Sequence, residues 1–231
     1  MKTKFTFLAI VFTVLFASGC AHVQPPISLP STYLANNAKP TIGVVKASTP
    51  TARTVNTGSM GLLDYAIVAA MNASLTDHLE SLDLSEFSDL HTLMIEKLKA
   101  DGFKVVFIDD EINWERLPKF GEQVGFAVKD FRDFKTKYHV DQLLVLQLVS
   151  AGTTRSYYGP MPTSEPQAFA TAQGQLVDLS NNQLVWYFEA KENIAINGAW
   201  DEPDLQFPLI TNSLYQCVES AKNNLQSSFY R

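Results

Sequence analysis

Apolar residues recur every three or four positions in three parts of the chain, which is the spacing of one face of an α-helix. The first stripe predicts a long helix beginning near Met60, with Leu63, Ile67, Met71, Leu75, Leu79 and Leu82 on its face. The second predicts a helix between an N-cap at Ser88 and a stop at Gly102, with Leu90, Leu93, Met94 and Leu98 on its face. The third predicts a final helix with a stripe of Ile210, Leu214, Cys217, Val218, Ala221 and Leu225.

Strand patterns lie between these helices. Residues 40–47 and 103–109 are short runs rich in β-branched residues. Residues 142–151 are almost entirely apolar, which predicts a strand that is covered on both faces and is therefore central in a sheet. A short helix is expected over 130–139.

A hairpin is predicted near the end of the chain. Residues 168–179 and 183–196 flank the turn Ser180-Asn181-Asn182, and asparagine tolerates left-handed backbone conformations. Two polar stretches, 48–59 and 153–166, are interpreted as loops. The order of elements predicts one α/β domain over residues 40–231, an α+β arrangement with a mixed sheet, helices packed on it, a β-hairpin and a C-terminal helix.

The chain begins with a secretory pattern. Lys2 and Lys4 precede a twelve-residue apolar run, and small residues follow before Cys20. A helix needs about 20 apolar residues to cross a bilayer, so this run is too short to remain as a membrane span. The pattern predicts a signal peptide over residues 1–19.

The sequence Ala-Ser-Gly-Cys ending at Cys20 resembles the lipobox of bacterial lipoproteins, with Ala17 where leucine is commonest in that family. The resemblance implies that Cys20 carries the lipid (diacylglycerol and commonly a further acyl chain such as palmitate), and that residues 20–39 form an anchor and extended tether. Ala21 stands where aspartate would favour the inner membrane, so we expect an outer-membrane lipoprotein that faces the periplasm. Two readings stay open: a cysteine near the cleavage site by chance, and a tether that packs on the domain through Tyr33 and Leu34.

The net charge of the chain restricts the classes of partner that it can bind. The whole chain has a formal net charge of −6. Without residues 1–19 it would carry 16 basic and 24 acidic side chains, a formal −8, which argues against nucleic-acid binding. If Cys20 is acylated, Cys217 is the remaining thiol, so no intramolecular disulfide and no multi-cysteine zinc site is expected. No cofactor is expected.

The order of elements is similar to that of the amino-terminal domain of TolB and of the periplasmic domains of curli-secretion-type lipoproteins. The residues that carry this resemblance are GLLDYAIVAAMNASLTDHL, LHTLMIEKLKADGFKVV and the hairpin GQLVDLSNNQLVWYFEA. The resemblance spans residues 40–228 and implies a non-catalytic subunit of an envelope assembly, with a protein partner and a tendency to form homo-oligomers.

An acidic cluster offers candidate chemistry. Asp109, Asp110 and Glu111 follow the strand at 103–108, and ligands favour the carboxyl ends of strands in open α/β sheets. Three carboxylates there could bind a divalent cation, or they could solvate a turn that precedes a helix.

Other polar groups give weaker signals. The four histidines form no zinc-protease pattern, and Cys217 falls on an apolar stripe, which predicts a buried thiol without activation. The loop 153–166 combines Tyr157, Tyr158, Pro160 and Met161, which predicts either a partner-binding surface or a disordered hairpin tip.

The leading functional hypothesis is therefore a membrane-anchored, non-enzymatic lipoprotein that acts by binding another protein as an accessory or assembly subunit of an envelope complex. One alternative is a metal-dependent envelope hydrolase that uses the acidic cluster. Another is a ligand-binding auxiliary lipoprotein of an ABC-type transporter, which would require a cavity.

Overall fold

The computed structural model describes residues 23–46, 49–110, 112–201 and 206–231. The predicted signal peptide and Cys20 lie outside these residues. The elements along the chain are β1 Ile42–Val45, β2 Arg53–Ser59, α2 Leu62–Met71, α3 Ala73–Glu80, the 3-10 turn η1 Ser85–Ser88, α4 Asp89–Ala100, β3 Val105–Ile108, α5 Asp133–Tyr138, β4 Gln142–Tyr158, β5 Met161–Pro162, β6 Gln167–Asp178, β7 Gln183–Ala195 and α6 Pro208–Phe229.

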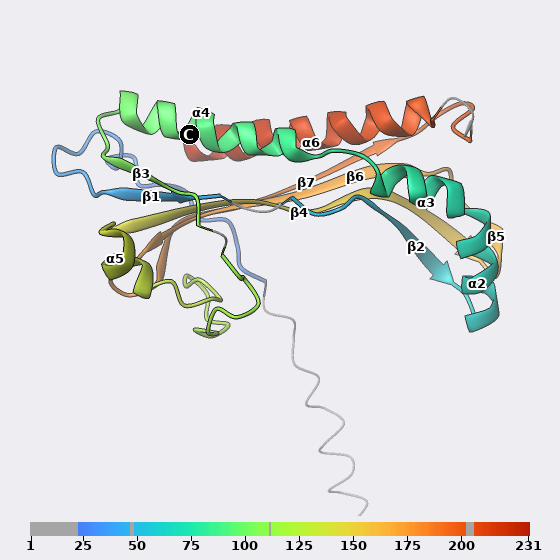
Figure 1. Ribbon diagram of the computed structural model, residues 1–231, viewed down its shortest axis with the longest axis horizontal. Helices are drawn as coiled ribbons and strands as arrows, with labels where there is room; N and C mark the ends of the chain where they lie inside the picture. The colour runs from blue at the N-terminus through green and yellow to red at the C-terminus, as the bar shows by residue number, and fades with distance from the viewer. Residues whose placement is uncertain (1–22, 47–48, 111, 202–205) are drawn as a thin grey trace, which may run out of the picture.

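The 17-residue strand β4 is the central strand of one mixed, seven-stranded sheet (Figure 1). At about 3.3 Å per residue it is roughly 55 Å long. Along one edge it pairs first with β1, in parallel, and further on with β2, also in parallel. Along its other edge it pairs antiparallel with β6, giving the order β3-β1-β4-β6-β7. The mixed α/β sheet and the central position of β4 are as predicted.

The predicted hairpin is formed by β6 and β7, which pair antiparallel along their length. Asn182 in its turn has a φ of 66°, the left-handed conformation expected there. Gly174 on β6 faces Trp186 on β7, and a Cβ at Gly174 would lie 2.2 Å from that indole ring. The glycine is therefore needed for the close approach of the fully buried tryptophan.

Helices α4 and α6 lie along one face of the sheet (Figure 1). The predicted stripe of α6 is buried against β4, β6 and β7. The predicted stripe of α4 packs near β1, β3 and α6, and all of it is buried except Leu93, which is exposed. Helix α4 ends as Gly102 predicts: the amide of Gly102, at φ 85°, donates to Lys99 O at 3.0 Å, and the amide of Phe103 donates to Leu98 O at 2.9 Å. These two bonds form a Schellman motif, which satisfies carbonyl groups at the helix end.

A second core lies on the opposite face of the sheet, near β1 and β3. Helix α5 and the segment 112–131 cover that face (Figure 1). The strand residues Val45, Leu143, Val145 and Val177 are buried there against Phe131 and Phe134. The near-continuous apolar run of β4 is thus buried on both faces at this end.

Three sequence predictions were wrong at the other end of the sheet. The stretch 48–59 contains the strand β2, and most of the predicted loop 153–166 is strand, because β4 runs on to Tyr158 and β5 pairs back onto it. These strands are rich in polar residues, and most of their side chains are half-buried or exposed, so their backbone pairing leaves no apolar pattern. The predicted long helix is two helices, α2 and α3, divided at Asn72.

The described part of the N-terminal segment packs on the domain. Ile27 and Tyr187 exchange backbone hydrogen bonds of 2.8 and 3.0 Å, and the Tyr33 ring stacks on Phe103 with centroids 5.5 Å apart. The packed alternative for the tether therefore applies to these residues. Among the described residues, no helix combines the length and apolar composition needed to cross a bilayer.

Candidate partner-binding surface

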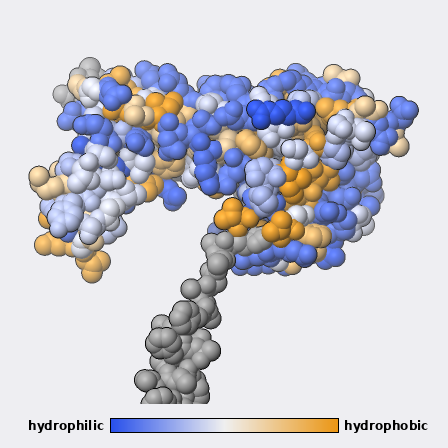
Figure 2. Space-filling model, turned by 180° about the vertical axis from the view of Figure 1, so that it is seen from behind, coloured by the Kyte–Doolittle hydropathy of each residue, from blue (hydrophilic) through white to orange (hydrophobic). Residues whose placement is uncertain are grey.

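An apolar surface covers the end of the sheet that lies farthest from α5. We call it the distal surface; its side chains are between 40% and 93% exposed and belong to Leu62, Leu63, Tyr65, Ile67, Met71, Tyr158 and Met161. The first five lie on α2 and the last two at the β4–β5 turn. Hydrophobic side chains at this end of the molecule are visible in Figure 2.

Hydrogen bonds hold α2 against the β4–β5 turn. The Asn72 side chain, after the last turn of α2, donates to the Tyr157 hydroxyl at 2.9 Å. The amide of Gly159 donates to Ser59 O at 2.8 Å, which fixes the turn beside the end of β2. The Asp64 carboxylate accepts from the amide of Gly61 at 2.8 Å and so caps the start of α2. The distal surface is therefore built on paired strands and a capped helix.

The composition of the distal surface is that of an interaction site. Its seven residues are leucine, isoleucine, methionine and tyrosine. Large contiguous apolar patches are uncommon on monomeric soluble proteins, and aromatic residues and methionine are enriched at protein interfaces. The charge nearest the start of α2, Asp64, is engaged with the backbone of Gly61.

The four residues predicted for partner binding are placed differently from one another. Tyr158 and Met161 are 74% and 68% exposed, Pro160 is half-buried, and Tyr157 is buried at 3%. Sequence reasoning missed the contribution of α2, because the periodicity of its stripe does not distinguish a covered helix face from an exposed one. The signal was the sequence LLDYAIVAAM itself, which is apolar almost all round the helix and in a surface helix leaves apolar side chains in solvent.

The acidic cluster is spread over two ion pairs. Asp109 contacts the Lys46 ammonium at 2.9 Å, while Asp110 accepts from the Tyr138 hydroxyl at 2.7 Å and from Lys137 at 3.0 Å. Hydrogen bonds from Tyr138 and then Lys137 lower the pKa of Asp110. Glu111 lies outside the described residues. No group of three or more histidine, cysteine or acidic side chains suited to a metal occurs in the described part of the chain, so the metal site stays a prediction.

The histidines and the cysteine of the core make structural contacts. His91 is buried with its ring nitrogens 3.1 Å from Leu146 O and 3.2 Å from Ser88 O, and burial lowers its pKa. The Cys217 thiol is buried and donates to Ala168 O at 3.4 Å. Burial raises its pKa to about 11, which keeps the thiol protonated and weakly reactive.

Comparison with known proteins found similar solved structures but no similar sequence. No family model and no curated protein sequence matches it. It is similar to the PelC dodecamer from Paraburkholderia phytofirmans (11% identity, TM-score 0.33, covering 82% of this chain and 92% of that chain). It is similar also to the hypothetical protein CT253 from Chlamydia trachomatis (12%, 0.33, 80% and 96%) and to lipoprotein GNA1162 from Neisseria meningitidis (14%, 0.26, 78% and 98%).

These solved structures thus include a bacterial lipoprotein. At such TM-scores the likeness carries no functional conclusion. The resemblance to TolB and to curli-secretion-type lipoproteins stays a prediction.

Proposed function

We propose that this protein is an envelope lipoprotein, anchored through Cys20 to the outer membrane and facing the periplasm, which binds another envelope protein through the distal surface. The N-terminal pattern that ends at Cys20 supports the anchor. The observation that carries the binding function is the exposure of seven large apolar side chains on α2 and the adjoining β4–β5 turn.

The shape of the distal surface favours a groove on a different protein over a second copy of this chain. Leu62 is 93% exposed and Leu63 is 74% exposed, so both project as knobs from the start of α2. Two convex surfaces that meet bury only their outermost side chains. An apolar groove also buries the sides of a projecting helix. A few anchor residues inserted in this way supply most of the free energy of binding.

Charge and position favour a protein over a lipid surface. None of the seven residues is basic, whereas helices that lie on anionic membranes are rich in lysine and arginine. The N-terminal segment joins the sheet at Ile27, which pairs with β7. The register from β7 through β6 to β4 places Ile27 in line with Val145. The thirteen residue-to-residue steps from Val145 to Tyr158 span about 40 Å, so the anchor leaves the distal surface free for a partner.

Site-specific photo-cross-linking in intact cells tests this function. A photoreactive residue at position 62 is expected to give one discrete adduct with another envelope protein, and the same residue at Leu93, an exposed leucine on α4, none. The purified partner should then bind the double variant Leu62→Ser, Leu63→Ser at least about 30-fold more weakly, roughly 2 kcal/mol, with the melting temperature unchanged. Leu93→Ser serves as the matched control, with unchanged affinity.

Other outcomes contradict the proposal in identifiable ways. Adducts at position 62 that contain only lipid or a second copy of this chain would exclude a groove on another protein. Equal adducts at positions 62 and 93 would show that the distal surface has no specific partner. The anchor is tested in the same cells, because a Cys20→Ser chain should move from the membrane fraction to the soluble periplasmic fraction.

A further inference from the structure

A cavity of about 280 Å³ lies on the face of the sheet opposite α4 and α6. Its floor is formed by β4, β6 and β7, and its walls by the segment 114–131 and by Gln24 of the N-terminal segment. Ligand pockets typically have volumes of about 300–1,000 Å³, so this cavity is just below that range and suits a ligand the size of one sugar ring. It is remote from the distal surface and has no part in the function proposed above.

Three glutamines form a row on the floor of this cavity. Gln147 on β4 and Gln173 on β6 are directly opposite each other in the register, and Gln175 is the next β6 residue on the same face. Gln173 donates to the Tyr187 hydroxyl at 2.7 Å. Neither Gln147 nor Gln175 has a side-chain hydrogen bond to any described residue, and both are half-buried. Each carboxamide therefore offers a donor and an acceptor to a ligand.

The lining of the cavity carries a single charged residue, Lys129. Its ammonium group donates to the backbone carbonyls of Leu117 at 3.2 Å and Glu115 at 3.4 Å, so two of its three donors are engaged with the wall. No acidic side chain lines the cavity to pair with a cation, and the Lys129 ammonium is already hydrogen-bonded to the wall, so an ionised ligand gains less than a neutral one for the cost of leaving water. The cavity is suited to a neutral ligand.

Aromatic side chains complete the lining, with Trp114 and Phe126 in the wall and Tyr187 in the floor. A pyranose ring has hydroxyl groups around its edge and apolar C–H faces, which match carboxamides and aromatic rings respectively. A peptide strand, the other neutral candidate, is captured by pairing with an exposed sheet edge. The glutamines lie on β4 and β6, which are interior strands with both edges already paired. The floor therefore favours a sugar over a peptide.

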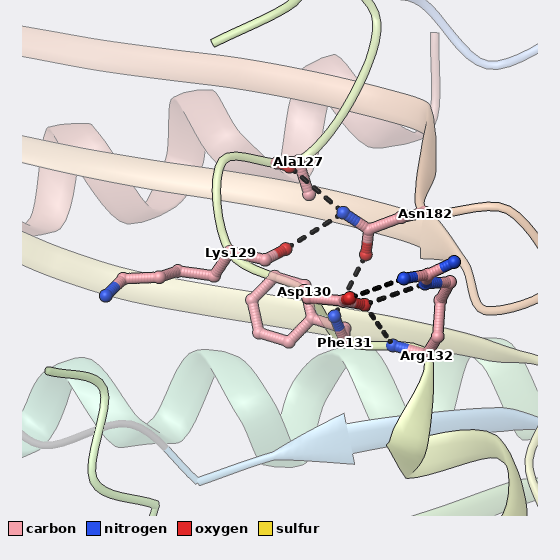
Figure 3. A network of polar contacts seen from close by, with 6 residues as sticks. All are labelled: Ala127, Lys129, Asp130, Phe131, Arg132 and Asn182. Carbon is pink, nitrogen blue, oxygen red and sulfur yellow. Dashed lines mark hydrogen bonds and ion pairs between the residues drawn. The ribbon is translucent and has the colours of Figure 1, made fainter. Parts of the chain in front are cut away.

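A buried hydrogen-bond network holds the wall in place (Figure 3). The Asn182 carboxamide donates to the carbonyls of Ala127 at 3.0 Å and Lys129 at 2.9 Å, and accepts from the amide of Phe131 at 3.0 Å. Asn182 is completely buried in the β6–β7 turn. The wall is thus fixed to the sheet before any ligand arrives, which lowers the entropy cost of binding.

We propose that this cavity binds a neutral sugar unit, with Gln147, Gln173 and Gln175 hydrogen-bonded to its hydroxyl groups and Trp114 and Phe126 packed on its apolar faces. The same chemistry serves a free monosaccharide and the terminal unit of an envelope glycan. A free sugar fills the cavity alone, whereas a glycan continues past the opening of the cavity.

Titration of the mature chain carrying Cys20→Ser tests the site. Glucose, galactose and N-acetylglucosamine are titrated, together with the disaccharides maltose and chitobiose, and followed by saturation-transfer NMR and tryptophan fluorescence. At least one neutral sugar should bind saturably. Gln147→Met and Gln175→Met, which keep the side-chain volume and lose the hydrogen bonds, should each lower its affinity about fivefold. Tighter binding of a disaccharide than of its monosaccharide indicates a glycan end, and equal binding indicates a free sugar.

The controls separate loss of the site from loss of the fold. Gln167→Met, at an exposed glutamine on the same strand β6, should leave the affinity unchanged, and melting temperatures identify any variant that unfolds. If a methionine variant unfolds, Gln147→Ala is used in its place. The proposal is overturned if no neutral sugar binds saturably up to 50 mM (on the order of 10⁻² M, a weak limit for a specific site), if Gln167→Met weakens binding equally, or if glucuronate or triglycine binds more tightly than every neutral sugar.

Discussion

The two ends of the sheet use the same strand β4 in opposite ways. At the end near β1 and β3, β4 is buried on both faces, between α4 and α6 on one side and α5 with the segment 112–131 on the other. At the distal end, β4 pairs with β2 and β5 and is flanked by α2, whose apolar side chains are exposed. The difference shows that apolar side chains are covered on both faces of the sheet at one end, whereas the distal end presents apolar side chains to solvent.

Two leucines on predicted helix stripes differ in burial in the same way. Leu98 on α4 is fully buried, whereas Leu63 on α2 is 74% exposed. The same periodicity placed both of them on the apolar face of a helix. The opposite burial arises because α4 lies on the sheet, while the only buried residue of α2 is Val68.

The largest difference in stability is expected between the alanine variants of these two leucines. Leu98→Ala should lower the free energy of unfolding by about 3 kcal/mol, because it leaves a cavity in the main core. Leu63→Ala should change it by less than about 0.5 kcal/mol, because the side chain is solvated in both states and alanine favours helix. Urea unfolding followed by circular dichroism measures both, and similar losses would show that α2 is packed against the body.

The two turns of the sheet should differ in the same direction by a smaller amount. Asn182→Ala should cost about 2 kcal/mol, because three buried hydrogen bonds are lost and alanine replaces asparagine at a φ of 66°. Asn182→Gly removes the same bonds without the backbone strain, so it should be less destabilising than Asn182→Ala.

Pro160→Ala, in the distal β4–β5 turn, is the matched change and should stay within about 0.5 kcal/mol. Thermal unfolding of the three variants provides the comparison. If Pro160→Ala lowered the stability as much as Asn182→Ala, the two turns would contribute equally, contrary to this expectation.

The smallest expected effect is a pH dependence from the buried end. Burial lowers the pKa of His91 in the folded state below its ordinary value near 6.5. Below about pH 6.5 the unfolded chain therefore binds a proton that the folded chain does not, so stability falls as the pH is lowered from 7 towards 5. His91→Gln should reduce this slope in a series of melting curves.

The distal half provides the comparison for that slope. His78 on α3 is half-buried, and burial lowers its pKa also. Because it retains more contact with water, His78→Gln should change the slope less than His91→Gln does. The reverse order would show that the distal half is the more strongly desolvated.

The sequence alone determined those features that depend on local chemistry. The stripes of α4 and α6, the stop at Gly102, the apolar run of β4 and the left-handed Asn182 each follow from residues within a few positions of one another. The buried, unactivated Cys217 was predicted from its place on the stripe of α6. The candidate partner residues Tyr158 and Met161 were found by their type, and the metal cluster and Cys20 stay predictions.

Only the tertiary structure decided which apolar stripes are covered. A helix face that lies on a sheet and one that faces water have the same periodicity, so Leu98 and Leu63 could not be separated from the sequence. The polar strand β2 was invisible for a related reason, because its partner strand is about 100 residues away and contributes backbone hydrogen bonds that leave no side-chain pattern. The row of glutamines likewise became a cavity floor only when the register of β4 and β6 placed Gln147 opposite Gln173 and the Asn182 network fixed a wall above them.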